Sequence, residues 1–182
     1  MKTMYFLLTL LIITLLGSCS SDNESPEPVK KESFRVKAIG LFAYQIPLTE
    51  GGALEVYGTM STKKVLGDDT VEERILWERN RTNWVSVGSN VTVINSEGSE
   101  HVFTLTEDEI KDGAEIEVYA NMMDKDPDGN PDDFLGEEAK LTPVGIIIIS
   151  ADQDESTDIQ LILDDFNGIT LLVRFSIEHI RD

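Results

Sequence analysis

Residues 101–123, HVFTLTEDEIKDGAEIEVYANMM, contain two stretches in which apolar and polar side chains alternate, separated by a short polar segment. Phe103 and Leu105 mark the apolar positions of the first stretch, and Ile116 and Val118 mark those of the second. Alternation with a period of two directs one face of a strand into a core and the other face into solvent. This part of the chain therefore predicts two half-buried β-strands joined by a short connection.

The connection itself predicts a short helix over residues 106–113. Thr106 is a preferred N-cap residue, Glu109 follows it by three positions as in a capping box, and Gly113 is a typical helix stop. The neighbouring strand patterns leave room for only one or two helical turns.

Alternation of the same kind recurs along the chain after residue 33, for example at Leu54/Val56, Val85/Val87 and Val91/Val93. Short strands separated by Gly, Asn, Asp and Thr are typical of an antiparallel sandwich or barrel. We therefore expect a single all-β domain over residues 33–182. The predicted strands are residues 34–46, 53–61, 74–78, 84–88, 90–95, 101–106, 114–123, 144–150, 158–165 and 169–180.

The first 18 residues predict a secretory signal. Lys2 supplies a positive charge, and Met4–Leu16 is an apolar run shorter than the about 20 residues that span a bilayer. The run ends in Leu16-Gly17-Ser18-Cys19, which resembles the lipobox of bacterial lipoproteins, and Cys19 is the only cysteine. The resemblance implies cleavage before Cys19 and its acylation with fatty acids such as palmitate. The alternative is an ordinary signal peptide with a stray cysteine.

Residues 19–32 predict a flexible tether, because they are polar, contain proline and show no apolar pattern. No aspartate follows Cys19 directly, which resembles lipoproteins sorted to the outer membrane. The SDNE stretch that begins at Ser21 resembles the acidic surface-export signals of some bacterial lipoproteins. We expect an outer-membrane lipoprotein on the periplasmic or extracellular face, with the cell surface favoured.

The overall charge restricts the partners. The chain has 34 acidic and 15 basic residues, a formal net charge of −19. Nucleic-acid binding needs a basic face, so this charge argues against it. It also argues against direct docking on anionic lipid head groups unless a divalent cation bridges the two surfaces. A single cysteine excludes a disulfide within the domain.

One turn of the chain, within residues 122–137 (MMDKDPDGNPDDFLGE), carries an unusual density of carboxylates. Like charges about 4 Å apart repel by roughly 1 kcal/mol in water and about 4 kcal/mol near a protein surface. A bound cation would relieve this repulsion, and calcium prefers oxygen ligands of this kind. The alternative is a solvated polar turn. The candidate metal ligands are Asp124, Asp126, Asp128, Asp132 and Asp133.

Two calcium-binding loops can be compared with this turn. The first three aspartates and Gly129 fit positions 1, 3, 5 and 6 of an EF-hand, but position 12 is Leu135 and the preceding segment predicts a strand. Residues 101–141 are more similar to C2 domains, in which a strand leads into D-x-D, polar residues, a further aspartate and a new strand. The resemblance implies Asp124 and Asp126 as calcium ligands. The third ligand would be Asp132 or Asp133.

The resemblance to C2 domains has one departure. Calcium-binding C2 domains also take aspartates from an earlier loop, and the corresponding residues 46–58 offer only Glu50 and Glu55 as acids, of which Glu50 lies in the expected loop. Asp68 and Asp69 are the nearest other candidates to complete such a site.

Residues 75–88 contain both tryptophans, Trp77 and Trp84, close to several arginines. An exposed pair of indole rings could bind a glycan or a cation. The alternative is a core role, because Ile75 and Trp77 are two positions apart and would share an inward face. This segment and Leu54–Gly58 are also similar to the β-sandwich appended to some bacterial thiol-activated cytolysin-type proteins.

No pattern in the sequence predicts catalysis. The two histidines, His101 and His179, lack a zinc-binding His-Glu-x-x-His pattern and a glycine-flanked serine before them. We therefore expect a non-catalytic, lipid-anchored binding or assembly protein with one C2-like antiparallel sandwich of about eight strands. Calcium in the aspartate turn would connect it to an acidic partner such as anionic lipid or glycan. The alternatives are a metal-free structural accessory subunit and a glycan-binding lipoprotein that uses the tryptophans.

Overall fold

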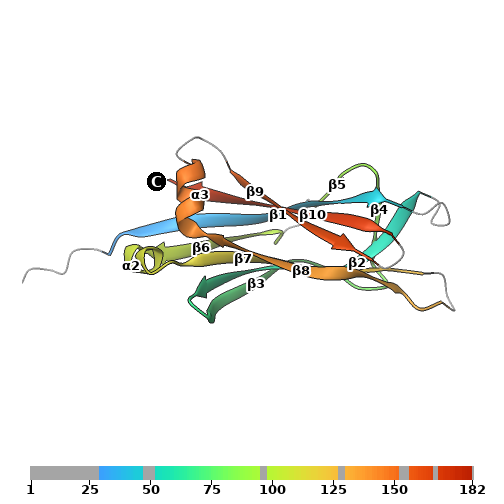
Figure 1. Cartoon of the computed structure of the whole chain (residues 1–182), viewed down its shortest axis with the longest axis horizontal. Helices are drawn as coiled ribbons and strands as arrows, with labels where there is room; N and C mark the ends of the chain where they lie inside the picture. The colour runs from blue at the N-terminus through green and yellow to red at the C-terminus, as the bar shows by residue number, and fades with distance from the viewer. Residues whose placement is uncertain are drawn as a thin grey trace, which may run out of the picture.

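The computed structural model describes residues 29–46, 52–94, 98–126, 130–151, 156–165 and 168–181. Within these ranges the chain forms two five-stranded antiparallel sheets that pack face to face (Figure 1), so the predicted all-β sandwich is confirmed. None of the helices in the described part of the chain is long and apolar enough to cross a membrane. The elements are β1 (Lys31–Gln45), β2 (Ala53–Leu66), β3 (Asp69–Arg79), β4 (Val85–Gly88), β5 (Thr92–Val93), β6 (Glu100–Thr106), α2 (Glu107–Lys111), β7 (Glu115–Asp124), β8 (Asp133–Pro143), α3 (Val144–Ala151), β9 (Thr157–Asp164) and β10 (Thr170–Ile180).

Each sheet is organised around two long central strands. The first sheet has the order β5-β1-β10-β9, and β6 also pairs with β1. The second has the order β3-β2-β7-β8, and β4 also pairs with β2. In each sheet, one edge of a long strand therefore pairs with two shorter strands in succession. β6 and β5 pair with β1, and β4 and β3 pair with β2.

The strand registers define two opposite ends of the sandwich. In β7, Glu115 pairs with Val65 of β2, whereas Asp124 pairs with Val56. At about 3.3 Å per residue, the ten residues of β7 separate the two ends by roughly 30 Å. We call the end at Asp124 the acidic end, because the aspartate turn begins there.

The other end carries the two helices of the described residues, α2 and α3, and we call it the helical end. α2 connects β6 to β7, and the Glu107 N–H donates to the carbonyl of Lys30, directly before β1 (3.2 Å). The Val144 N–H of α3 donates to the carbonyl of Ala114, directly before β7 (3.0 Å). The start of β1 therefore lies beside α2 and α3 (Figure 1).

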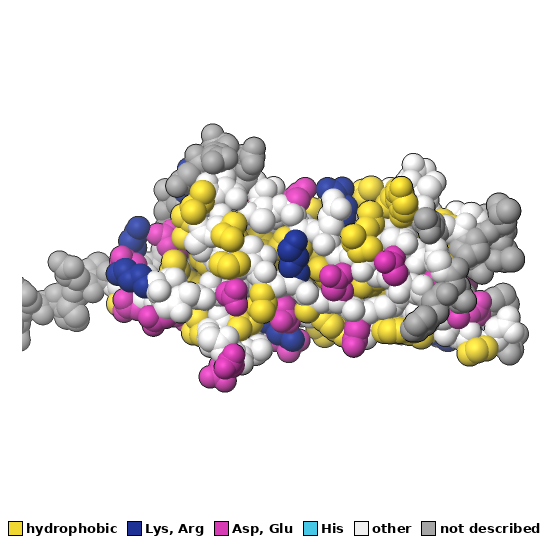
Figure 2. Space-filling view, in the orientation of Figure 1, with side chains coloured by type: hydrophobic (Ala, Val, Ile, Leu, Met, Phe, Trp, Pro, Cys, Tyr) yellow, Lys and Arg dark blue, Asp and Glu magenta, His cyan; other side chains and the backbone are white. Residues whose placement is uncertain are grey.

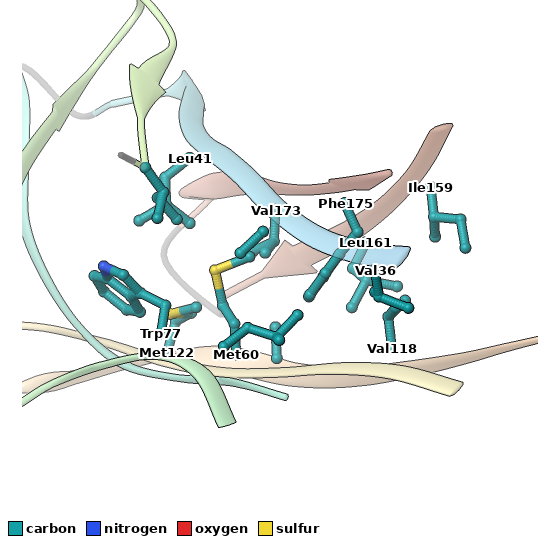
Figure 3. Close-up of a cluster of buried hydrophobic side chains, with 14 of the residues drawn as sticks. Val36, Leu41, Met60, Trp77, Val118, Met122, Ile159, Leu161, Val173 and Phe175 are labelled. Atoms are coloured by element: carbon teal, nitrogen blue, oxygen red, sulfur yellow. The ribbon is translucent and has the colours of Figure 1, made fainter. Parts of the chain in front are cut away.

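The core fills the space between the two sheets. Figure 3 shows Met60 and Trp77 from one sheet directed toward Val173 and Phe175 from the other. The alternating pairs Leu54/Val56, Phe103/Leu105 and Ile116/Val118 are fully buried, as the period of two predicts. Val91 and Val93 are 42% and 58% exposed, so the alternation there does not mark a core face.

The helix α2 confirms the predicted helix start. The Thr106 hydroxyl accepts from the Glu109 N–H (3.2 Å), and the Glu109 carboxylate accepts from the Thr106 N–H (2.7 Å). Glu109 also pairs with Lys64 (3.1 Å), which ties the helix to the second sheet. These contacts, together with the first-turn acids Glu107 and Asp108, stabilise a helix of only five residues.

Residues 144–150, predicted as a strand, form the helix α3 instead. Four consecutive isoleucines have no period, so the run does not distinguish a buried strand from a helix. The structure buries Val144 and Ile147, which are three positions apart, and exposes Ile146 and Ile149. This is the pattern of one helix face packed on the sandwich, and it allows the chain to pass from the edge strand β8 to the edge strand β9.

The expectation that Ile75 and Trp77 share an inward face is wrong. The register shifts between Met60 and Ser61, so that Met60 pairs with Trp77 and Ser61 pairs with Ile75. The extra residue, Leu76, makes a β-bulge. As a result Leu76 and Trp77 are both buried, whereas Ile75 is 56% exposed.

Candidate functional site

The aspartate turn connects β7 to β8 at the acidic end. Asp124, the last residue of β7, pairs with Asp133, the first residue of β8. Asp132 directly precedes β8, and Asp126 lies two residues beyond β7. The structure thus places four of the five predicted metal ligands along the two sides of this turn, and Asp128 lies outside the described residues.

Asp124 is the most enclosed of these carboxylates. It continues the inward-facing series of β7, which ends at Met122 and Asp124, and it is 3% exposed. Its Oδ1 accepts a hydrogen bond from the Glu55 N–H of β2 (2.7 Å). This hydrogen bond gives the buried Asp124 carboxylate the partner that a buried charged group needs.

Asp132 is held by a cation that the chain itself supplies. The Nε of Arg81 donates to both oxygens of Asp132, at 2.8 and 3.0 Å, and the Tyr57 hydroxyl donates to Oδ2 at 2.7 Å. The Asp126 N–H also donates to Asp132 Oδ1 (3.2 Å). We call these four residues, Tyr57, Arg81, Asp126 and Asp132, the arginine cluster. The Arg81 guanidinium also donates to the backbone carbonyl of Asp126 (3.2 Å), so it bridges both sides of the turn.

The electrostatics of the cluster follow from these contacts. The hydrogen bonds from Arg81 and Tyr57 lower the pKa of Asp132 below its usual value. Burial of the Tyr57 hydroxyl, and its hydrogen bond to Asp132, raise the pKa of Tyr57 to about 12. Burial, with the nearby charges of Asp133 and Asp132, raises the pKa of Asp126. The turn is thus a place where negative charge is crowded and only partly compensated by Arg81.

A second set of contacts supports the turn from its other side. Lys125 pairs with the Glu55 carboxylate (3.0 Å), and its N–H donates to the Glu55 carbonyl (2.9 Å). The Lys125 ammonium lies 5.1 Å from the centre of the Trp84 ring. Trp84 is therefore a partner of the turn, in a cation–π contact with the chain's own lysine.

The other predicted parts of a metal site do not assemble here. Asp69 pairs with Leu66 at the far end of β2, ten residues and roughly 30 Å from Val56, the partner of Asp124 at the acidic end. Asp68 and Asp69 therefore do not complete the site. Glu50 lies outside the described residues. Among the described residues, no three His, Cys, Asp or Glu side chains form a group that could hold a metal ion.

The predicted glycan surface does not form a pair of exposed rings. Trp77 is 4% exposed and lines, with Leu41 and Ile94, a cavity of about 220 Å³ between the sheets. Its ring also lies 5.7 Å from the Arg79 guanidinium. Trp77 acts as a core residue, and only Trp84 lies near the acidic end.

Each histidine contacts a carboxylate, His101 at a partly exposed position and His179 at a largely buried one. The His101 ring contacts Glu72 (2.9 Å), and the His179 ring contacts Glu32 (2.9 Å) and stacks on Phe34. The first pair joins β6 of one sheet to β3 of the other, and the second joins the neighbouring strands β10 and β1. Neither histidine is brought to the acidic end.

Sequence reasoning missed Tyr57 and Arg81 as parts of this site. Tyr57 follows the inward-facing Val56, and this alternation places it on the outer face without indicating a partner. Arg81 is 51 positions from Asp132, and only the folded sheet brings the two together. A lone arginine after an aromatic strand carries no signal of its own.

The comparisons with known proteins give a likeness of fold alone. No family model matches the chain, and no curated protein does. Among solved structures, a pair of C2 domains from extended synaptotagmin 2 matches with a TM-score of 0.38 and 19% identity, over 84% of this chain and 43% of that one. A C2 domain protein from Ramazzottius varieornatus matches with a TM-score of 0.36 and 10% identity, over 84% and 91%. Another C2 domain has a TM-score of 0.29 and 12% identity, over 81% and 98%.

These structures are of the class that residues 101–141 resemble, and the chain spans less than half of the first one. Their low similarity assigns no ligand to this chain. The sandwich architecture is established by its own strand pairing.

Proposed function

We propose that this chain is a lipid-anchored binding module of the bacterial outer membrane, with no catalytic role. One observation carries the proposal: β1 begins at the helical end, where Lys30 contacts α2, and the aspartate turn lies at the opposite end. A domain tethered in this way presents the acidic end away from the lipid surface. The surface-exposed face of the membrane remains the favoured location, on the strength of the SDNE stretch.

The binding surface is the acidic end, organised by the arginine cluster. The guanidinium of Arg81 lies at the centre of the turn, where it contacts Asp132 and the backbone of Asp126. A metal ion in the same place would have to displace it or bind beside it. We therefore infer that Arg81 supplies the positive charge for the carboxylates on both sides of the turn, and that the acidic end binds its partner without calcium. This proposal keeps the predicted binding role and shares only the metal-free turn with the alternative of a structural accessory subunit.

Calcium binding is the second candidate, and the crowding of carboxylates favours it. Asp126 has a raised pKa because of burial and of its neighbours Asp133 and Asp132, so added positive charge would stabilise the turn. Asp124 and Asp126 would be the first oxygens available to such an ion, with further oxygens from Asp133. In this case calcium would connect the module to anionic lipid or glycan.

A thermal melt decides between the two candidates. We expect the Tm of the wild-type chain in about 5 mM calcium to lie within roughly 1 °C of its Tm in chelator, because Arg81 already supplies the positive charge. A calcium site filled at 100 times its dissociation constant would instead add about 2.7 kcal/mol, and a Tm increase of roughly 5–10 °C. An increase of that size, abolished by Asp126→Asn, would establish calcium binding and reject the metal-free proposal.

The anchor has its own test. We expect the wild-type chain, expressed in a bacterium, to incorporate labelled fatty acid and to be cleaved before Cys19, because Leu16-Gly17-Ser18-Cys19 resembles a lipobox. Cys19→Ser should abolish both the label and the cleavage. Ser18→Thr, a small change at the preceding position, serves as the matched control for general damage to the signal. A wild-type chain recovered in the soluble fraction without fatty acid would reject the anchor.

A further inference from the structure

The helix α3 presents an apolar face to solvent. Ile146 and Ile149 are 53% and 63% exposed, whereas Val144 and Ile147 on the opposite face pack into the core. Ile146 and Ile149 are three positions apart, so they lie on one side of the helix. Figure 2 shows hydrophobic side chains gathered over this part of the surface.

This face lies at the helical end, where the sequence before β1 joins the sandwich. Val29, the first described residue, is itself 62% exposed and apolar. The carbonyl of Lys30, the next residue, accepts a hydrogen bond from the first residue of α2. The carbonyl of Ala114, between α2 and β7, accepts a hydrogen bond from the first residue of α3. The apolar face and the predicted lipid tether therefore share one end of the molecule.

We propose that α3 is the surface that rests on the membrane, with Ile146 and Ile149 inserted at the boundary between head groups and acyl chains. The inference rests on the proposed lipid anchor at Cys19. Residues 20–28 separate that anchor from Val29, and a coil of this length spans roughly 15–18 Å on average. The helical end lies within this reach, and the acidic end lies roughly 30 Å farther away.

The charged side chains at the helical end indicate which kind of membrane this end would contact. Lys30 pairs with Glu32 (2.9 Å), and Lys111 pairs with Glu107 (3.0 Å). Positive and negative side chains thus accompany each other at this end, and Figure 2 shows both kinds there. A strongly anionic membrane would gain little from such a mixed surface. The contact therefore depends on the apolar side chains, and a zwitterionic phospholipid is the fitting partner.

The acyl anchor provides the affinity in this arrangement, and α3 provides the orientation. Two exposed isoleucines alone would bind lipid weakly and reversibly, as interfacial helices with few apolar residues do. Held near the surface by the anchor, they fix which end of the sandwich faces the lipid. The acidic end is then directed toward the partner.

The test uses the full-length, acylated chain in phosphatidylcholine vesicles. An environment-sensitive fluorophore is attached at Ile149→Cys, and in a matched variant at Phe134→Cys, an exposed apolar position at the acidic end. Acylation of Cys19 leaves the introduced cysteine as the only thiol for labelling. We expect a quencher on the lipid acyl chains to reduce the emission at position 149 by about twofold or more and to leave position 134 unchanged.

Each outcome supports or overturns the inference. Quenching at 149 alone supports it, whereas no quenching at either position, or quenching at 134, overturns it. Protection of position 149 that depends on protein concentration and not on lipid would identify a second copy as the occupant, and would also overturn it.

Two controls separate the possible failures. Both labelled variants should melt within about 2 °C of the parent chain, because the replaced side chains are exposed. Fluorophore attached to the parent chain itself would show a free Cys19 thiol, which is a failure of the proposed anchor and not of the α3 surface.

Discussion

Alanine at position 58 is expected to destabilise the sandwich more than alanine at Gly67, the glycine directly after β2. Gly58 has φ +140°, a conformation that side chains with a Cβ rarely adopt. A Cβ there would also collide with the carbonyl oxygen of Asn121 and lie 3.0 Å from the Cα of Met122, both in β7. Because these are backbone atoms of a central strand pair, the sheet has to move to accept the methyl group.

The expected cost is about 2–5 kcal/mol, the sum of an unfavourable φ of about 1–2 kcal/mol and steric overpacking of about 1–3 kcal/mol. The corresponding Tm decrease is roughly 10 °C for a domain of this size. Denaturant titration followed by circular dichroism measures it directly. The position matters for the site as well, because Gly58 directly follows Tyr57, whose hydroxyl binds Asp132.

Gly67→Ala is the matched control for this prediction. Gly67 also has a positive φ, +61°, but nothing lies within 4 Å of the position that a Cβ would take. We expect it to cost only about 1 kcal/mol, the conformational part alone. Equal destabilisation by the two variants would show that the close approach of β2 and β7 is not what requires glycine at position 58.

Most of the strands could be predicted from sequence because a period of two reports burial directly. The paired positions Phe103/Leu105 and Ile116/Val118 lie in long strands with one face on the core, where the pattern and the structure have the same cause. The helix α2 could be predicted because its capping box lies within four consecutive residues. Local chemistry of this kind needs no knowledge of the rest of the fold.

The errors have the opposite origin. Helix α3 contains β-branched residues that favour strands, and its helical form is set by the need to connect two edge strands at the helical end. The exposure of Ile75 depends on a bulge that is defined by its partner strand β2. Both features are decided by contacts with distant segments, which a local pattern does not contain.

The sequence pattern indicated the aspartates of the candidate site but not its arginine. Asp124 and Asp132 stand out because many carboxylates are close together in the sequence. Arg81 belongs to a different loop and becomes their neighbour only when β3 and β7 have taken their places on either side of β2. The sequence therefore suggested that an external cation was missing, and the folded chain provides an internal one.

The consequence of that internal cation is a large expected effect for Arg81→Glu. The variant removes the donor to both oxygens of Asp132 and places a new carboxylate beside Asp126 and Asp132. We expect the Tm at pH 7 to fall by roughly 5–10 °C, since like charges in contact near a protein surface repel strongly. Arg79→Glu is the matched control, because it makes the same change of charge two residues away, where the Arg79 guanidinium donates to the backbone of Glu78 and lies over the Trp77 ring.

The pH dependence distinguishes electrostatic repulsion from a loss of packing. In the wild type the pKa of Asp132 is lowered, so the stabilisation by Arg81 is complete above the ordinary carboxyl pKa of about 3.9 and is lost as the pH falls through the lower value in the folded chain. In Arg81→Glu the crowded carboxylates instead have raised pKa values, and protonation relieves their repulsion. The Tm difference between Arg81→Glu and Arg79→Glu should therefore shrink steadily from pH 7 to about pH 4.

Exchanging the charges of Arg81 and Asp132 tests the same ion pair in the opposite direction. In the double variant Arg81→Glu/Asp132→Arg, opposite charges again face each other across the turn, and we expect the Tm at pH 7 to recover by about half of the loss. The recovery is partial because Tyr57 and the Asp126 N–H, both donors to Asp132 in the wild type, would then face a guanidinium that cannot accept. An Arg81→Glu chain that melts like Arg79→Glu at pH 7 would mean that the guanidinium does not hold the turn. The carboxylates of the acidic end would then depend on solvent or on an added ion for their compensation.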